Sequence, residues 1–90
     1  MVRISIPPTL RKLCSGEDAV LVRPGTLSDA LNQLQERFHG IQERLCDENG
    51  EIRGSVLIIV NDEDVRFLAS KQTPLKSGDE VAIIPAFAGG

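Results

Sequence analysis

The chain has 90 residues, a net charge of −3 and 41% hydrophobic residues. This length and composition suit one modest folded domain, and the chain is too short for two. With three Phe and no Trp or Tyr, the core must be mainly aliphatic. No basic cluster interleaves with aromatic residues, so the acidic balance argues against a nucleic-acid partner. The same balance suits a protein partner with a basic docking rim.

Targeting and metal-binding signals are weak. The longest aliphatic run, Val56–Val60, is too short to cross a bilayer, and the first residues lack the regions of a signal peptide. We therefore expect a cytoplasmic protein with no membrane partner. In that compartment Cys14 and Cys46 are expected to be reduced and partly buried, although the sequence leaves a disulfide between them open. One histidine, His39, with two scattered cysteines predicts no metal site.

The first third of the chain predicts a β-hairpin. Apolar and polar residues alternate from Val2 to Ile6, which is typical of a strand with one buried face. Two prolines end this strand, because proline cannot donate to a ladder. Residues 9–16 are expected to form a loop whose two leucines, Leu10 and Leu13, pack on the core. Residues 19–23 form the second strand of the hairpin.

The one convincing helix follows. Thr26 and Asp29 have the spacing of a capping box, and apolar residues recur at helical spacing from Leu27 to Phe38, with Leu31 and Leu34 among the expected core residues. Gly40 is expected to close the helix. Residues 41–46 add one short turn at most, and residues 47–54 read as an exposed loop.

The second half of the chain predicts three strands. Val56–Val60 is a continuous aliphatic strand. The acidic residues 61–64 form a solvated hairpin turn, because they lack the glycine and distal glutamate of a calcium loop. Val65–Phe67 is expected as a short returning strand. Leu75 joins the core, and residues 81–84 form the final strand.

The two aliphatic strands are apolar on both faces. Such strands are normally covered on both sides and lie inside a sheet, so we expect the final strand to be central and rigid up to Pro85. One helix covers only one face. The second face must be covered by loops, by curling of the sheet over itself, or by another protein.

The chain ends in a narrow apolar tail, Ala86-Phe87-Ala88-Gly89-Gly90. Chain termini are usually frayed, but glycine has no Cβ and permits close approach to its carbonyl carbon. We therefore interpret Gly90 as a reacting group, presented without any processing step by the residues before it. Two terminal glycines carry this meaning only if a rigid domain ends where the tail begins.

The order of elements, with a central last strand that ends in Gly-Gly, resembles the ubiquitin-like β-grasp fold. The turn Gly78-Asp79-Glu80 and the ending Gly89-Gly90 resemble the ThiS/MoaD family of sulfur carriers over essentially the whole chain. The run from Val60 to Phe67, together with Ser5-Ile6-Pro7, narrows the resemblance to the CysO-like branch. The resemblance implies an α+β fold in which a mixed sheet of four or five strands packs on one main helix. It implies one domain, residues 1–90, with a flexible tail over about residues 86–90.

The resemblance also implies a chemistry. An E1-like enzyme would adenylate the Gly90 carboxylate with ATP, and sulfur from a partner would displace AMP to leave a thiocarboxylate. In the CysO-like branch this sulfur attacks an aminoacrylate on a PLP-dependent cysteine synthase, and a metal-dependent peptidase later releases the product. The carrier itself binds no cofactor.

The residue roles implied by the resemblance are few. Gly90 is the acyl group, and Gly89 and Ala88 form the slim approach to it. Ile84 and Phe87 match apolar partner-binding positions, and Phe67 is expected to join them. Phe87 is larger than the aliphatic residue common at its position, which could alter partner preference. Neither cysteine takes part.

Other functions remain to be compared. Molybdopterin and thiamin-thiazole synthesis, or a thiocarboxylate natural product, would use the same carrier chemistry. A ubiquitin-like modifier would share the adenylation and differ only in the fate of Gly90, which would join lysines. An iron–sulfur electron carrier is excluded because it needs four cysteines. No nucleophile–base pair supports an autonomous enzyme.

Overall fold

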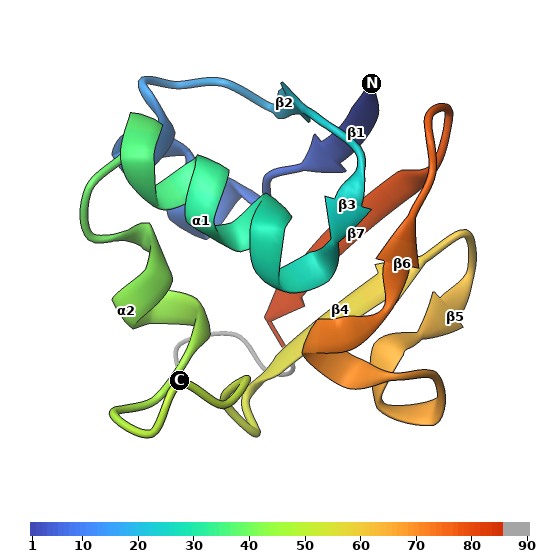
Figure 1. Cartoon of the computed structure of the whole chain (residues 1–90). Coiled ribbons are helices and arrows are strands. Elements are labelled where there is room, and N and C mark those ends of the chain that lie inside the picture. The colour runs from blue at the N-terminus through green and yellow to red at the C-terminus, as the bar shows by residue number, and fades with distance from the viewer. Residues whose placement is uncertain (86–90) are drawn as a thin grey trace.

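A computed structural model describes residues 1–85 of the chain, and five of its strands form one mixed sheet (Figure 1). The order across the sheet is β2-β1-β7-β4-β5. All neighbours are antiparallel except β1 and β7, which run parallel. The strands are β1 (Val2–Ser5), β2 (Ala19–Val22), β4 (Val56–Val60), β5 (Glu63–Asp64) and β7 (Glu80–Pro85). The short strands β3 (Gly25–Thr26) and β6 (Pro74–Leu75) pair separately.

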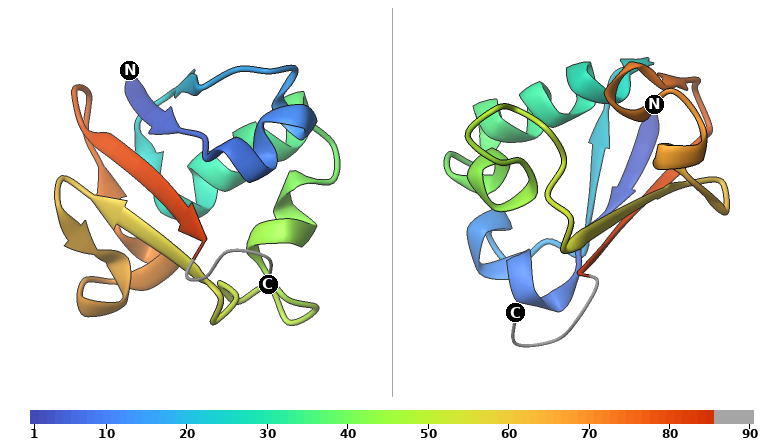
Figure 2. Two further views of the ribbon diagram at one scale, coloured as in Figure 1. Left: turned by 180° about the vertical axis from the view of Figure 1, so that it is seen from behind. Right: turned by 90° about the horizontal axis from the view of Figure 1, so that it is seen from below.

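The main helix α1 (Leu27–Arg37) lies across one face of this sheet, which we call the inner face (Figure 2). Its start is fixed by the predicted capping box: the Asp29 N–H donates to Thr26 Oγ1 at 3.2 Å, and the Thr26 N–H donates to Asp29 Oδ2 at 3.0 Å. The helix buries a stripe of four residues, Leu27, Ala30, Leu31 and Leu34. The mixed sheet packed on one main helix is the β-grasp arrangement that the sequence predicts.

The core is aliphatic and lies between α1 and the inner face. All six residues that the sequence assigns to it are buried: Ile4, Ile6, Leu31, Leu34, Val60 and Leu75. The short helix α2 (Ile41–Leu45) adds Ile41 and Leu45 to the same core.

In residues 1–85 no helix has the length and apolar character needed to cross a membrane.

Two predictions for the connecting segments are wrong. Residues 9–16 are not a loop, because Pro8 starts a 3₁₀ helix, η1 (Pro8–Cys14), which buries Leu10 and Cys14. Proline favours this first helical position, where its missing N–H costs nothing. Gly40 does not close α1 but caps the start of α2 with a positive φ of 98°, and α1 already ends at Arg37.

The expected strand Val65–Phe67 is also wrong. Asn61 and Asp62 take positive φ values of 47° and 74° in a two-residue hairpin turn that joins β4 to β5. The ladder between β4 and β5 has only two residue pairs. The Asp64 carboxylate accepts a hydrogen bond from the Arg66 N–H at 2.8 Å and turns the chain into the 3₁₀ helix η2 (Val65–Phe67). A second 3₁₀ helix, η3 (Ser70–Gln72), leads to β6.

The expected central position of the last strand is confirmed. β7 lies between β1 and β4, and its ladder with β4 continues to the pair Val56↔Pro85. The sequence predicts that one helix covers one face and that loops, curling of the sheet or another protein must cover the second, and residues 1–85 agree with the first part. Residues of β4 and β7 that point to α1 are buried, whereas their outward-pointing neighbours are half-buried or exposed. The outer face is therefore left partly open by residues 1–85, as the view from behind in Figure 2 shows.

Candidate functional site

The candidate site begins where β7 ends. β7 is paired on both sides, to β1 through Ser5↔Ala82 and to β4 as far as Val56↔Pro85. A strand hydrogen-bonded to two neighbours has little freedom to move. The chain therefore reaches Pro85 from a fixed platform. The predicted reacting group Gly90 and the predicted tail residues Gly89, Ala88 and Phe87 lie outside the described residues.

Arg66 secures the part of β4 that pairs with the end of β7. Its Nη2 donates to the backbone oxygens of Val56 at 2.7 Å and Arg53 at 3.0 Å. Since Val56 is the partner of Pro85, these bonds tie η2 to the exit of the last strand. Sequence reasoning did not assign this role to Arg66. The only available signal was its place in the acidic run that ends in Val-Arg-Phe.

The outer face beside this exit is apolar. The cross-strand pairs Leu57↔Ile84 and Ile59↔Ala82 put four side chains on it, of which Ile84 is the most open, with 43% of its surface exposed. We call Leu57, Ile59, Ala82 and Ile84 the outer apolar surface. The prediction that Ile84 meets a partner requires an exposed side chain at this position.

Phe67 comes to the same end of the sheet from η2. It is 87% exposed, although its neighbour Arg66 is bonded to the start of β4. Leu68, which follows it, is also exposed. A large aromatic side chain held in water costs free energy unless a partner covers it. Phe67 and Ile84 are thus the exposed members of the predicted partner-binding set within the described residues.

The other end of β7 is fixed by polar contacts. Asp79 accepts a hydrogen bond from the Lys76 N–H at 2.7 Å and another from Asn61 Nδ2 at 2.9 Å. The Lys76 N–H is the main reason that the pKa of Asp79 lies below its usual value, and the Asn61 bond adds to it. Asn61 also accepts from the Glu80 N–H at 3.0 Å. The Gly-Asp turn therefore links the β4–β5 hairpin to the start of β7.

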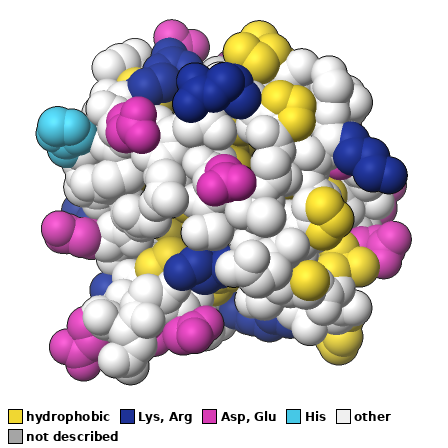
Figure 3. Space-filling view, in the orientation of Figure 1, with side chains coloured by type: hydrophobic (Ala, Val, Ile, Leu, Met, Phe, Trp, Pro, Cys, Tyr) yellow, Lys and Arg dark blue, Asp and Glu magenta, His cyan; other side chains and the backbone are white. Residues whose placement is uncertain are grey.

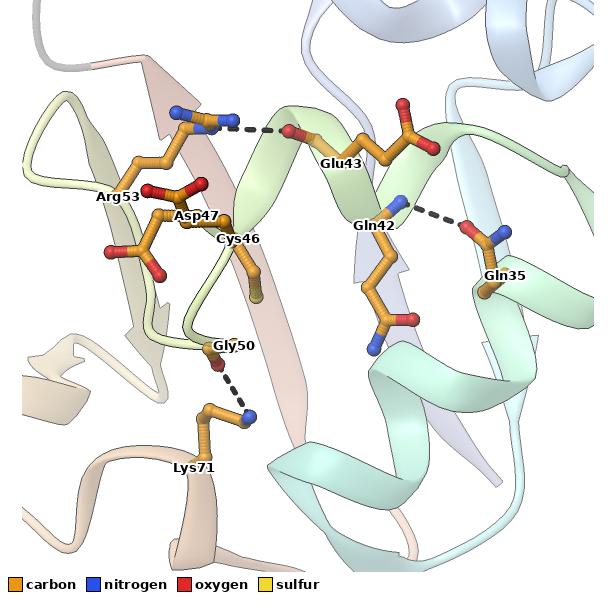
Figure 4. Close-up of a pocket in the computed structure, with 9 residues that line it drawn as sticks. Gln35, Gln42, Glu43, Cys46, Asp47, Gly50, Arg53 and Lys71 are labelled. Atoms are coloured by element: carbon orange, nitrogen blue, oxygen red, sulfur yellow. Dashed lines mark hydrogen bonds between the residues drawn. The ribbon is translucent and has the colours of Figure 1, made fainter.

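Both cysteines are free and buried. Burial raises the pKa of the Cys14 thiol and of the Cys46 thiol, so neither is activated as a nucleophile. Cys46 lines an open pocket of about 560 Å³ between α2, the loop after it and η3 (Figure 4). Lys71 and Arg53 in this pocket donate to the backbone oxygens of Gly50 and Glu43, so both act as braces of the loop.

Charged side chains are spread over the face seen in Figure 3, and yellow apolar side chains lie both at its upper edge, where Figure 1 places β2, and along its right side, where Figure 1 places β6. Within residues 1–85 no three His, Cys, Asp or Glu side chains are grouped so that they could hold a metal ion. The candidate site therefore consists of the fixed end of β7 and the outer apolar surface beside it.

Comparison with known proteins identifies the class. The sequence model of the ThiS family matches residues 5–90, and the chain belongs to this family. It is 42% identical to the sulfur carrier protein CysO of Mycobacterium tuberculosis, over 99% of this chain and 98% of that protein. The fold matches the crystal structure of the Amycolatopsis orientalis BexX/CysO complex with a TM-score of 0.93, 37% identity and full coverage of both chains.

The chain also has a more distant relative of another kind. Ubiquitin-related modifier 1 of Laccaria bicolor is 31% identical over 98% of this chain and 77% of that protein. The predicted resemblance to the ThiS family and its CysO branch is thus confirmed, as is the ubiquitin-like fold.

Proposed function

We propose that this protein is a sulfur carrier whose Gly90 carboxylate is adenylated by an E1-like enzyme, converted to a thiocarboxylate and used to supply sulfur for cysteine synthesis. It acts as a substrate of its partner enzymes. The observation that carries the proposal is strand β7, which is paired on both sides as far as Ala82 and to β4 as far as Pro85, and which leaves residues 86–90 to carry the terminal carboxylate. The likeness to CysO over nearly the whole chain supports the same branch.

The proposed chemistry takes place in three steps. A carboxylate oxygen of Gly90 attacks the α-phosphorus of ATP, which releases pyrophosphate and leaves an acyl adenylate. A sulfur nucleophile supplied by a partner then attacks the acyl carbon and expels AMP. The resulting thiocarboxylate sulfur adds to the β-carbon of an aminoacrylate held by a PLP-dependent synthase, which gives a thioester. The acyl group of Gly90 then passes from the cysteine sulfur to the cysteine amine, and a metal-dependent peptidase hydrolyses this amide to release cysteine.

The chain contributes position and shape to these steps. The two bonds from Arg66 to the start of β4 keep the exit of β7 fixed. The outer apolar surface and Phe67 offer an area that a partner can cover. Gly89 and Ala88 add little bulk, so the tail can enter a narrow active site.

The test is the length of the tail. Deleting Gly90 shortens its reach by about 3.3–3.6 Å, and a misplacement of about 1 Å can cost about a hundredfold in rate. We expect the deletion, and likewise the addition of one residue after Gly90, to abolish ATP–pyrophosphate exchange with the E1-like enzyme of the same organism. Gly89→Ala keeps the length and should only slow the exchange.

Circular dichroism provides the folding control, since both length variants should melt as the original protein does. Intact-mass spectrometry of the protein from its own cells should show one oxygen replaced by sulfur, and a cysteinyl adduct would assign the cysteine branch. Normal exchange and thiocarboxylate formation by both length variants would mean that Gly90 is not the reacting group.

Conjugation to proteins is a second candidate, because the relative from Laccaria bicolor is a ubiquitin-related modifier. It would use the same adenylation and then join Gly90 to a lysine. Proteins of higher mass that carry residues 77–90 on a lysine after tryptic digestion, which cleaves this chain last at Lys76, would favour it over sulfur transfer. Molybdopterin and thiamin-thiazole synthesis would be distinguished by which synthase accepts the thiocarboxylate.

A further inference from the structure

Strand β2 forms an edge of the sheet whose outward backbone groups are almost all unpaired. The Ile6 N–H donates to Asp18 O at 2.9 Å, so by the alternation of an antiparallel ladder the directly bonded pairs are Ile4↔Val20 and Val2↔Val22. The N–H and C=O groups of Ala19, Leu21 and Arg23 therefore point away from β1. Within residues 1–85, only Gln33 bonds to this side of the strand.

Gln33 shows that this edge accepts a peptide group. Its side-chain amide accepts from the Arg23 N–H at 2.8 Å and donates to Arg23 O at 3.3 Å. This is the pair of bonds that a residue of a neighbouring strand would make. Gln33 thus closes the edge at Arg23 and leaves Ala19 and Leu21 open.

We propose that β2 pairs with β2 of a second copy of this chain in an antiparallel ladder. The register places Ala19 of one copy opposite Leu21 of the other, so that each pair exchanges two N–H···O bonds. Val20 lies on the two-fold axis. In a register with Leu21 opposite Leu21, Ala19 would face Arg23, whose backbone Gln33 already occupies.

The side chains of this register are self-complementary, as an interface with two-fold symmetry requires. Leu21 is 55% exposed and Ala19 is half-buried, so a large side chain lies over a small one in each pair. The charges at the two ends of the strand are opposite, because Glu17 and Asp18 precede it and Arg23 follows it. Gln33 fills the backbone position opposite Arg23, so the ladder ends at Ala19, and Glu17 of one copy meets the exposed Arg23 of the other through side chains alone.

The pairing would join two sheets edge to edge and leave the outer apolar surface of each copy open. Because β7 runs parallel to β1 and antiparallel to β2, the two β7 strands would end at opposite sides of the dimer. Each copy could then present its own tail. A ladder of two residue pairs makes a small interface, and small interfaces are weak and transient.

The experiment is sedimentation equilibrium of the full chain in low salt, from about 20 μM to about 2 mM, with amide spectra recorded over the same range. We expect the mass to rise toward that of a dimer and the shifts to change at residues 19–21. Leu21→Lys should raise the Kd at least about tenfold. Phe67→Asp is the matched control on the other side of the sheet and should leave the dimer unchanged.

Charge reversal tests the register itself. Glu17→Arg and Arg23→Glu each place like charges across the twofold, so each variant alone should be mainly monomeric. An equimolar mixture of the two should associate again, because the added arginine of one faces the added glutamate of the other. A wild-type mass that stays monomeric at 2 mM, a mixture that stays monomeric, or a dimer lost in Phe67→Asp would each overturn the proposal.

Discussion

Single side chains on α1 hold the helix on the sheet. Leu34 is fully buried, so its replacement by Ala removes apolar contacts and leaves a cavity. We expect Leu34→Ala to lower the free energy of unfolding by about 2–5 kcal/mol, measured by urea denaturation. Glu36→Ala, an exposed change on the same helix, should stay within about 0.5 kcal/mol. A cost near zero for Leu34→Ala would mean that another face of α1 meets the sheet.

Asp79 gives a second prediction at this scale. Its pKa in the folded state is lowered from 3.8, chiefly by the bond from the Lys76 N–H and then by Asn61. Because the folded value lies below the unfolded one, the carboxylate stabilises the fold above the unfolded value. This contribution is lost as the pH falls through the folded value. Asp79→Asn should therefore flatten the loss of stability in acid, measured by denaturation at each pH.

Carboxyl carbon NMR can check the cause of this shift. Asn61→Ala removes one of the two bonds to Asp79 and should move the pKa of Asp79 part of the way back toward 3.8. An Asp79 that titrates at or above this value in the original protein would contradict the hydrogen-bond account.

Among the elements, the exit of β7 depends on its neighbour β4. Arg66 bonds to Val56 O and Arg53 O, and Val56 faces Pro85. Arg66→Ala should lower the free energy of unfolding by about 1–2 kcal/mol, because the residue is exposed and water replaces part of the bonds. Amide exchange should become faster at Leu57 and Ile84.

The β1–β2 hairpin serves as the internal control for this change, since within residues 1–85 the hydrogen bonds of Arg66 go to Asp64, Arg53 and Val56. Its amides should keep their protection. Arg44→Ala, at an exposed position on α2, should leave exchange along β4 and β7 unchanged. Equal loss of protection in all strands would show that Arg66 supports the whole fold and not the strand exit.

For the whole molecule, the open outer face is the main unassigned surface. We expect Ile84→Ala, Phe67→Ala and Phe87→Ala each to weaken binding to the E1-like enzyme by about tenfold or more, since exposed apolar anchors often dominate an interface. Their melting temperatures should change by less than about 4 °C. Calorimetry of binding and of unfolding measures the two effects separately.

Leu21→Ala is the matched control for this surface, because Leu21 is more exposed than Ile84 but lies on strand β2, on the other side of β7 from β4. It should leave binding to the enzyme unchanged. A large fall in the melting temperature of Phe87→Ala, with intact binding to the E1-like enzyme, would place Phe87 in the core. Loss of binding in Leu21→Ala would move the docking area to the β2 side.

Much of the fold could be predicted because its signals are local. The capping box at Thr26 needs only two residues at the right spacing, and the alternation from Val2 to Ile6 needs only one strand. The segments that failed depend on competing local bonds. Asp64 could continue a strand or cap a 3₁₀ helix, and the bond that its carboxylate accepts from the Arg66 N–H ends the ladder after two residue pairs.

The sequence by itself determined the ubiquitin-like class, the core of α1, the central place of β7 and the residues 86–90 as the proposed reactive tail. Each follows from apolar periodicity, capping chemistry or a motif contained in one segment. Only the tertiary structure decided what distant segments do together. Arg66 reaches Val56, Asn61 reaches Asp79, and Gln33 closes the edge of β2 at Arg23. Such contacts depend on how the strands are ordered in the sheet, and a hydrogen bond between residues far apart in the chain leaves no periodic trace in the sequence.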